Sequence, residues 1–472
     1  MSFTSPAFFA FFIVYLLLSC VLRQRAWLWL AAAASSFFYA WWDWRFLFLL
    51  YYVVTIAWWV GRRMARTEDA RVRRRYLTAS IVSCLLVLGT FKYFNFFTDS
   101  FRNLSAAFGM PLDIHVARVL LPVGISFYTF HALSYTIDLY RRRLRQPADY
   151  LTVLVYLAYF PQLVAGPIVR ASRFIPQIGR GPQFKPRKVK TGLLLIAWGY
   201  FLKVCVADSI ALLVDPIFAA PGQFESGNLL FAIVSYSFQI YCDFSGYSLI
   251  AIGLAKLQGF DFPANFLAPY FSRSCREFWR RWHISLSSFL RDYLYIPLGG
   301  NRGGPMREDR NLLTTMGLGG LWHGASWNFV VWGLLHGGYL VMERRLGVAI
   351  EPVARGRMAR WTISAVRMLG VYVLVLLTWV FFRLHGFDDA LAYLRGIARL
   401  ESVTAVSNRF EASRAVALIA VVVAVDALFI RRRRLVRLLR TRYGYAFSLG
   451  ALGVLIQLFG SFGGGAFIYF QF

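Results

Sequence analysis

The sequence predicts an all-α polytopic membrane protein, and three observations lead to this prediction. Hydrophobic residues make up 58% of the 472 residues, whereas roughly half is typical of soluble globular chains. Several uncharged runs approach the ~20 residues of helix that cross the ~30 Å hydrocarbon core of a bilayer. These runs also lack the alternation of apolar and polar residues that the strands of a membrane β-barrel show. We expect one transmembrane domain over residues 1–472.

The first three apolar runs cover residues 6–22, 26–42 and 46–60. Residues 1–5 carry no Lys or Arg, so we expect the first run to be a retained helix and not a signal peptide. Arginines cluster at 61–75, 141–145 and 431–442, and the positive-inside rule places such loops in the cytoplasm. The N-terminus, the 92–118 loop and Phe472 then lie outside.

The run 151–165 does not fit this simple alternation. It is short, contains Pro161, and is flanked by basic residues on both sides, with seven of them and no acid between Arg170 and Lys190. If both flanks are cytoplasmic, the run enters the membrane and returns. Irregular backbone survives at that depth only where protein or a water-filled cavity satisfies it, so we expect a cavity open to the cytoplasm.

Six further apolar runs follow along the chain. They cover residues 192–219, 229–255, 312–341, 361–382, 416–430 and 445–460. The third arginine cluster stays cytoplasmic if the glycine-dense run 312–341 also enters and returns. The total is then about ten transmembrane helices, with re-entrant and interfacial helices in addition.

The charge balance has an ordinary explanation in such a protein. Lys and Arg number 52 against 23 acidic residues, a net charge of +29, which in a soluble protein would suggest nucleic acid. Here the basic residues lie between apolar runs, and no nucleic-acid-binding motif is present, so we expect the lipid bilayer and no nucleic acid as a partner. The five cysteines show no metal-ligand spacing, and no metal site is predicted.

A polar stripe stands out within residues 271–304. At 100° per residue on one helix, six residues fall within an arc of about 80°; they are Arg273, Arg276, Arg280, His283, Ser287 and Arg291. Phe278, Trp282, Leu286 and Phe289 fall on the opposite side. An interfacial helix with arginines at lipid head groups explains the stripe, and a functional His283 among those arginines is the alternative.

A second histidine, His323, lies inside an apolar, glycine-dense segment, GLGGLWHGASWNFVVWGLLHGG. An ionisable residue within a membrane segment usually faces a cavity or a partner. The glycines at 319, 320 and 324 can allow a substrate to approach His323, serve close helix packing, or do both, since each needs small residues. On one continuous helix His336 would lie ~20 Å further along, so we exclude it from the same centre. His131 and His385 look unremarkable, and His115 falls in the outer loop.

Other candidates rank lower. Tyr241 and Asp243 form a polar cluster in YCDFSGYS, where Asp243 is expected to be a structural hydrogen-bonding partner, and Lys203 is expected to pair with Asp208. No GxSxG elbow, HExxH helix or phosphate loop is present, which argues against a hydrolase, a metalloprotease or an NTPase.

Several stretches resemble the membrane-bound O-acyltransferase family, and within it the alginate O-acetyltransferase branch. They are LPVGISFYTFHALSYTIDLYR, FPQLVAGPIVR, YCDFSGYSLIAIG, EFWRRWHISLSSFLRDYLYIPLGGNRGG, GGLWHGASWNFVVWGLLHG and the terminal GGAFIYFQF. The resemblance places the family's catalytic histidine at His323 and its second functional histidine at His283. It implies a funnel through the membrane with an acyl thioester entering from the cytoplasm. Leu249 departs from the acidic residue expected after GYS.

The resemblance implies O-acetylation of an extracytoplasmic polysaccharide such as alginate, with acetyl-CoA as donor and no tightly bound cofactor. A separate extracytoplasmic esterase-like (SGNH-type) acetyltransferase is the expected partner, and the bacterial inner membrane the expected location. A histidine with a pKa near ~6.5 can take the hydroxyl proton at neutral pH; we assign this to His323, with His283 orienting the acyl group or steadying the oxyanion.

Substrate binding is assigned to residues of the stripe and its surroundings. They are Arg273, Arg276, Arg280, Ser287, Arg291, Trp322, Trp327, Asn328, Tyr241 and Asp243. Two alternative functions remain open. One is D-alanyl transfer to teichoic acid within the same family, and the other is transport of a polysaccharide precursor, because intramembrane histidines and basic cavities also suit transport.

Overall fold

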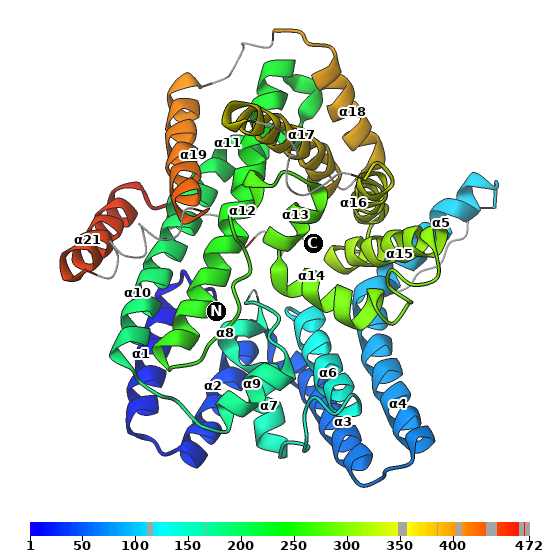
Figure 1. Cartoon of the computed structure of the whole chain (residues 1–472), viewed down its shortest axis with the longest axis vertical. Coiled ribbons are helices and arrows are strands. Elements are labelled where there is room, and N and C mark those ends of the chain that lie inside the picture. The colour runs from blue at the N-terminus through cyan, green and yellow to red at the C-terminus, as the bar shows by residue number, and fades with distance from the viewer. Residues whose placement is uncertain are drawn as a thin grey trace. The chain divides into compact units, whose positions relative to one another are not determined.

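The structure is a computed structural model that describes residues 1–110, 117–164, 166–347, 356–384, 386–402, 408–430, 441–461 and 467. Every regular element within these ranges is a helix, as predicted (Figure 1). His115, His385 and residues 431–440 of the third arginine cluster lie outside the described residues.

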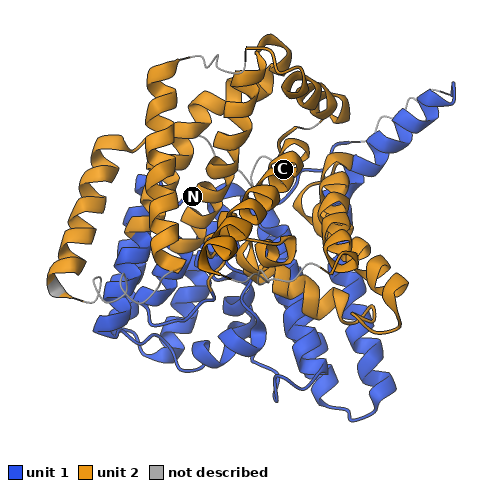
Figure 2. Ribbon diagram, turned by 45° about the horizontal axis from the view of Figure 1, so that its top comes forward, with its two compact units in different colours: residues 1–196, 250–263 blue, residues 197–249, 264–472 orange. Residues whose placement is uncertain are grey.

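The helices form two compact units, coloured separately in Figure 2. The first comprises residues 1–196 and 250–263, and the second comprises residues 197–249 and 264–472. The division between the two units falls within α10 (Pro186–Tyr200) and within α12 (Ser226–Leu257).

The first unit is a bundle in which α3 packs on α4 and α6, and α7 packs on α2 and α3. Its elements are α1 (Pro6–Val21), α2 (Gln24–Asp43), η1 (Trp44–Phe46), α3 (Leu47–Ala65), α4 (Ala70–Leu88), η2 (Gly89–Tyr93), α5 (Phe94–Ala107), α6 (Ile125–Tyr140), α7 (Tyr150–Ala158), α8 (Phe160–Leu163) and α9 (Ala171–Ile178). Side-chain caps start several of them; Ser5, for example, accepts from the backbone N–H of Phe8 at the start of α1.

The second unit holds both histidines singled out above. Its other elements are η3 (Phe201–Ala207), α11 (Asp208–Ala219), η4 (Pro221–Gln223), η5 (Pro269–Phe271), α13 (Cys275–Arg281), α14 (Ile284–Leu290), η6 (Arg291–Tyr295), α15 (Pro305–His323), α16 (Trp327–Arg345), α17 (Arg357–Arg383), α18 (Phe387–Ala398), α19 (Arg409–Ile430) and α21 (Arg442–Phe459).

Four helical stretches of the described chain are long and apolar enough to cross a membrane. They cover Gln24–Ala65, Ala70–Ala107, Arg357–Arg383 and Arg409–Ile430. Pro6–Val21 and Tyr443–Phe459 are apolar but shorter. The chain is therefore a helical protein with several membrane-compatible helices, and the finer count of ten spans rests on the sequence.

The two runs predicted to enter and return are both interrupted. Within 151–165, α7 ends at Ala158 and α8 begins at Phe160, with Tyr159 non-helical between them. Within 312–341, α15 ends at His323 and α16 begins at Trp327, and the two helices pack as an antiparallel hairpin in which Gly320 faces Gly333. In both cases a helix ends where a helix that spans the membrane would continue.

An aromatic core in the second unit surrounds the hairpin. Trp282 packs 5.0 Å from Trp379 of α17, and Trp379 packs 6.1 Å from Trp332 of α16, measured between ring centroids. All three side chains are fully buried. Buried aromatic pairs of this kind contribute about 0.5–1.5 kcal/mol each beyond their area, and they fix the elements that carry the two histidines.

Candidate active site

His323 is the last residue of α15, and the sequence explains why the helix ends there. Gly324 follows it in an extended conformation, and a Cβ on Gly324 would lie 2.0 Å from the ring of Phe329. Gly320 and Gly333 allow the two helices of the hairpin to touch, because a Cβ on Gly320 would meet the carbonyl oxygen of Phe329 at 2.1 Å. The glycines therefore serve close packing, which was one of their two predicted roles.

Aromatic rings enclose the imidazole of His323. The ring centroids of Trp322 and Trp332 lie 5.0 Å from it, and that of Phe382 lies 5.4 Å from it. Only 4% of the residue is exposed. Such a wall keeps water away from the imidazole, and a group that reacts there must first pass it.

His283 lies at a break between two short helices. It follows Trp282 after the end of α13 and has a φ of 41°, the left-handed region, before α14 begins at Ile284. A non-glycine residue held there costs about 1–3 kcal/mol, and such strain is concentrated at functional sites. Asn265 stabilises the break, because its backbone carbonyl accepts the N–H of Ile284 at 2.9 Å.

The side chain of Asn265 also holds the imidazole of His283. Its Oδ1 lies 3.1 Å from Nδ1 of His283 and accepts from both the backbone N–H and the hydroxyl of Ser285. Phe244 packs edge-on against the imidazole at 4.6 Å, and His283 is completely buried. Nothing in the spacing of the sequence indicated Asn265, since it comes from the irregular chain before η5.

The structure brings the two predicted histidines together. The ring centroids of His283 and His323 lie 6.2 Å apart, and Trp322 contacts both rings, at 5.9 and 5.0 Å. One oxygen atom that hydrogen-bonds two groups can join atoms up to about 6 Å apart. The two imidazoles can therefore act on the same reacting group.

The predicted polar stripe is wrong. It assumed one continuous helix, but the chain breaks at Trp282 and His283, so positions beyond the break turn to a new face. His283 is fully buried, whereas Arg276, Arg280 and Arg291 are exposed. The apolar side of the pattern is confirmed, because Phe278, Trp282, Leu286 and Phe289 are all buried.

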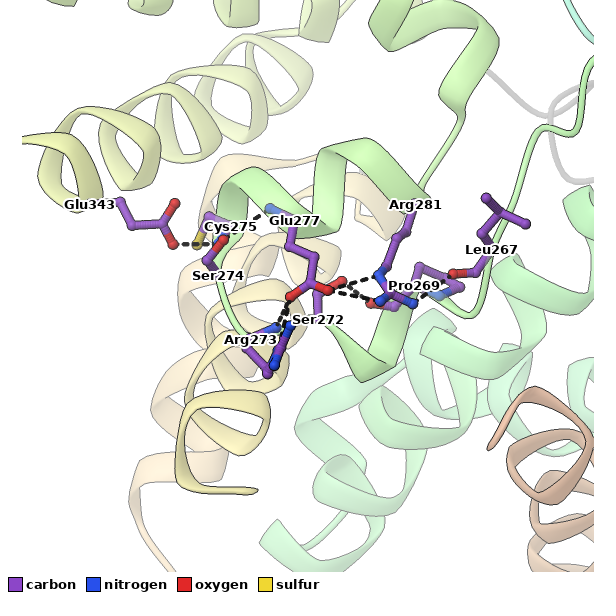
Figure 3. A network of polar contacts seen from close by, with 9 residues as sticks. All are labelled: Leu267, Pro269, Ser272, Arg273, Ser274, Cys275, Glu277, Arg281 and Glu343. Atoms are coloured by element: carbon purple, nitrogen blue, oxygen red, sulfur yellow. Dashed lines mark hydrogen bonds and ion pairs between the residues drawn. The ribbon is translucent and has the colours of Figure 1, made fainter. Parts of the chain in front are cut away.

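The arginines of the stripe contact carboxylates or are exposed to solvent. Glu277 accepts from the backbone N–H of Arg273 at 2.8 Å and from Nη2 of Arg281 at 2.8 Å (Figure 3). Arg276 donates its backbone N–H to Glu343, and Arg291 pairs with the adjacent Asp292. The predicted role of these arginines in substrate binding has no support from their geometry.

Glu277 is ionised by this arrangement. Its helix α13 has seven residues, too few to span a membrane. Burial raises the pKa of the Glu277 carboxyl, but the N–H of Arg273 and the guanidinium of Arg281 outweigh it and hold the pKa below its usual range. Figure 3 shows both arginines converging on this carboxylate.

Four other residues that were predicted to bind substrate have different surroundings in the structure. Trp322 contacts both imidazoles, whereas Trp327 is 60% exposed at the start of α16. Asn328 donates Nδ2 to the carbonyl oxygens of Leu384 and Gly386, which ties α16 to the end of α17. Ser287 donates its hydroxyl to the carbonyl of His283 at 3.1 Å, inside the first turn of α14.

Tyr241 and Asp243, both on α12, form buried polar contacts with other helical elements. The hydroxyl of Tyr241 donates to Asp426 of α19 at 3.0 Å. Asp243 forms an ion pair with Lys203 at 2.7 Å, and Lys203 also pairs with Asp208 at 2.7 Å. The predicted Lys203–Asp208 pair is therefore confirmed, and Asp243 is a structural partner in it.

The exclusion of His336 rested on a continuous helix, and that premise is wrong. The hairpin turn places His336 on α16, where its ring lies 4.7 Å from Trp332, which in turn lies 5.0 Å from His323. His336 nevertheless has its own partner, because its Nε2 lies 3.0 Å from the hydroxyl of Thr378. It belongs to the same aromatic core without facing His283. His131, in the first unit, is completely buried beside Tyr156.

Among the described residues, pockets and clusters of metal-binding side chains give no further candidate site. A pocket of about 510 Å³ lies along α4, η2 and α5 with a mostly apolar lining that includes Phe94, Phe97 and Arg102. It contains no predicted site residue. Among the residues that the structure describes, no group of three or more His, Cys, Asp or Glu is placed to hold a metal ion.

Comparison with known proteins places these residues in a wider context. The sequence model of the membrane-bound O-acyltransferase family matches residues 125–384, a range that includes both histidines. Probable alginate O-acetylases from Azotobacter vinelandii and Pseudomonas aeruginosa are each 42% identical, over 74% of this chain and 68% and 66% of their own lengths. A peptidoglycan O-acetyltransferase from Helicobacter pylori is 33% identical over 87% of this chain and 81% of its own length.

Proposed function

The chain belongs to the membrane-bound O-acyltransferase family, and we propose that it transfers acetyl groups for the O-acetylation of an extracytoplasmic polysaccharide. The names of its relatives support a polysaccharide acceptor, alginate in two cases and peptidoglycan in a third. The observation that carries the proposal is the pair of imidazoles, 6.2 Å apart and walled by aromatic rings.

The chemistry at this pair is acyl transfer from a thioester, for which we propose acetyl-CoA. A hydroxyl oxygen attacks the carbonyl carbon, a C–O bond forms, and the C–S bond breaks. His323 takes the hydroxyl proton and returns it to the departing thiolate sulfur, which leaves as a thiol. The aromatic wall excludes water, so that hydrolysis of the thioester does not compete.

The wall also implies a gate. In the structure the nitrogen atoms of both imidazoles are buried, and we propose that binding of the thioester displaces part of this wall. Lid and loop movements that open a site and then exclude water accompany many transfer reactions.

We further propose the surroundings in which the reaction takes place. A single domain over residues 1–472, with about ten transmembrane helices and further re-entrant helices around a funnel, lies in the bacterial inner membrane with the N-terminus outside. The acetyl group passes to an extracytoplasmic esterase-like (SGNH-type) transferase that acts on the polymer. Labelling of single cysteines introduced at both ends of residues 151–165 tests this topology, because equal sidedness of the two ends is required.

The enzymatic proposal is tested with the purified chain in lipid vesicles. We expect acetyl-CoA to release free CoA when a hydroxyl acceptor is supplied, and His323→Ala to lower the rate by at least about 10²-fold. Full activity of that variant refutes the role of His323. Turnover only with a D-alanyl carrier thioester would favour D-alanyl transfer, and sugar uptake without thioester cleavage would favour transport.

A further inference from the structure

The hydrogen-bonding pattern around His283 determines which of its ring nitrogens carries the proton. Oδ1 of Asn265 lies 3.2 Å from the backbone nitrogen of Ser285. A backbone N–H can only donate, so the side-chain atom that faces it must be the amide oxygen and not the NH2 group. The orientation of the Asn265 amide is therefore fixed by a group that has no alternative.

The other end of the amide agrees with this orientation. Nδ2 of Asn265 lies 3.0 Å from the hydroxyl oxygen of Ser248 on α12, which can accept its hydrogen. The same Oδ1 that faces the N–H of Ser285 lies 3.1 Å from Nδ1 of His283. Because this oxygen can only accept, Nδ1 of His283 must carry a hydrogen.

The second nitrogen of His283 then has a lone pair. The ring is completely buried, and no salt bridge to it is formed among the described residues. An unpaired buried charge is very costly, so the neutral ring is the stable form. With the hydrogen on Nδ1, Nε2 is an acceptor, and it has no hydrogen-bond partner within the part of the chain that the structure describes.

We propose that Asn265 is a positioning residue that holds His283 with Nε2 as a proton acceptor beside His323. This inference rests on the proposed function, and it revises the role expected of His283, because a neutral Nε2 with a lone pair cannot donate to an oxyanion. The step proposed for His323 alone changes with it: the proton lost by the attacking hydroxyl is shared between His323 and Nε2 of His283. When the C–S bond breaks, the proton goes to the thiolate sulfur, and both rings return neutral.

Two measurements test the proposal. The first is the tautomer of the His283 imidazole, which does not depend on activity, and the second is the rate of acetyl transfer. Nitrogen NMR of the chain with ¹⁵N-labelled histidine, assigned with His283→Gln, should show the Nδ1–H form of His283. Asn265→Ala should populate the other tautomer and lower kcat by about 10- to 100-fold, as for the loss of a partner that orients a functional histidine. The KM for acetyl-CoA should change less than about twofold, because Asn265 is buried and acts through His283.

Asn265→Asp separates positioning from folding. The carboxylate keeps the acceptor for Nδ1–H and stabilises the imidazolium, so activity should largely return and the acidic limb of the pH–rate profile should move to higher pH. Asn311→Ala is the matched control, because Asn311 is also buried and donates Nδ2 to a backbone carbonyl, that of Gly300. It should lower the Tm without altering the tautomer or the pH profile.

The outcomes distinguish this inference from the proposed function. An Nε2–H form of His283 in the unmodified chain overturns the inference even if acetyl transfer is normal. So does an Asn265→Ala variant that keeps its rate and pH profile. Absence of acetyl transfer by the unmodified chain, with the Nδ1–H form present, contradicts the proposed function while the assignment of the tautomer stands.

Discussion

The imidazole of His283 lies 6.2 Å from that of His323, and each ring comes from a place where a helix stops. His283 precedes α14 in a left-handed conformation, and His323 closes α15 before the hairpin turn. Helix ends free the backbone around a side chain from the regular spiral. Both imidazoles can therefore turn toward one point. Two residues in the middle of different helices would do so less readily.

The first prediction concerns the coupling of these two histidines. In the proposed mechanism both imidazoles act on one reacting group, so we expect His283→Ala and His323→Ala each to lower kcat by about 10²- to 10⁴-fold. The double variant should be no worse than the more damaged single variant, since residues that act as a unit are strongly non-additive. Steady-state release of CoA by the four proteins measures this. Multiplicative losses would show that the two rings act in separate steps.

The second prediction concerns the packing of the hairpin. Alanine at Gly320 would place a Cβ 2.1 Å from the carbonyl oxygen of Phe329, so the helices must separate. Overpacking of this kind costs about 1–3 kcal/mol, and Gly320→Ala should lower the Tm and the activity together. Gly338→Ala on α16 is the matched control, because nothing lies within 4 Å of its added Cβ. That variant should leave the Tm unchanged or raise it.

The apolar runs and the histidine in the glycine-dense segment were predictable because they are local features of the sequence. The break at His283 was not, because a periodicity argument assumes that a helix continues. What stops this helix is distant in the chain: Asn265 accepts the N–H groups of Ile284 and Ser285 with its backbone and its side chain. The turn after His323 had a local signal, because Gly324 is followed by Ser326, the residue before α16. The exclusion of His336 assumed one continuous helix and ignored this signal.

The third prediction concerns the buried cluster of Lys203, Asp208 and Asp243. Lys203→Met leaves two buried carboxylates without their shared cation, and loss of one partner of a buried ion pair costs about 3–5 kcal/mol. We expect a large drop in the Tm or a failure to accumulate in the membrane. Adding Asp208→Asn and Asp243→Asn to Lys203→Met should restore much of the loss. A Lys203→Met protein as stable as the original chain would show that the ion pairs of this cluster do not contribute to stability.

The last prediction concerns pH and Glu277. The folded state lowers the pKa of this carboxyl, so its ion pairs contribute stability that is fully present above the unfolded pKa of about 4.3. That stability is lost as the pH falls through the lower folded value, because the unfolded state binds the proton first. For the unmodified chain in detergent, the Tm should therefore decrease once the pH is lower than about 4. Glu277→Gln should have a lower Tm at pH 7, because hydrogen bonds to charged groups contribute about 1.5–3 kcal/mol to stability. Its Tm should then decrease less on acidification than that of the unmodified chain. Equal Tm values for the two proteins at pH 7, with parallel decreases on acidification, would mean that Arg273 and Arg281 do not hold this carboxylate in the folded protein.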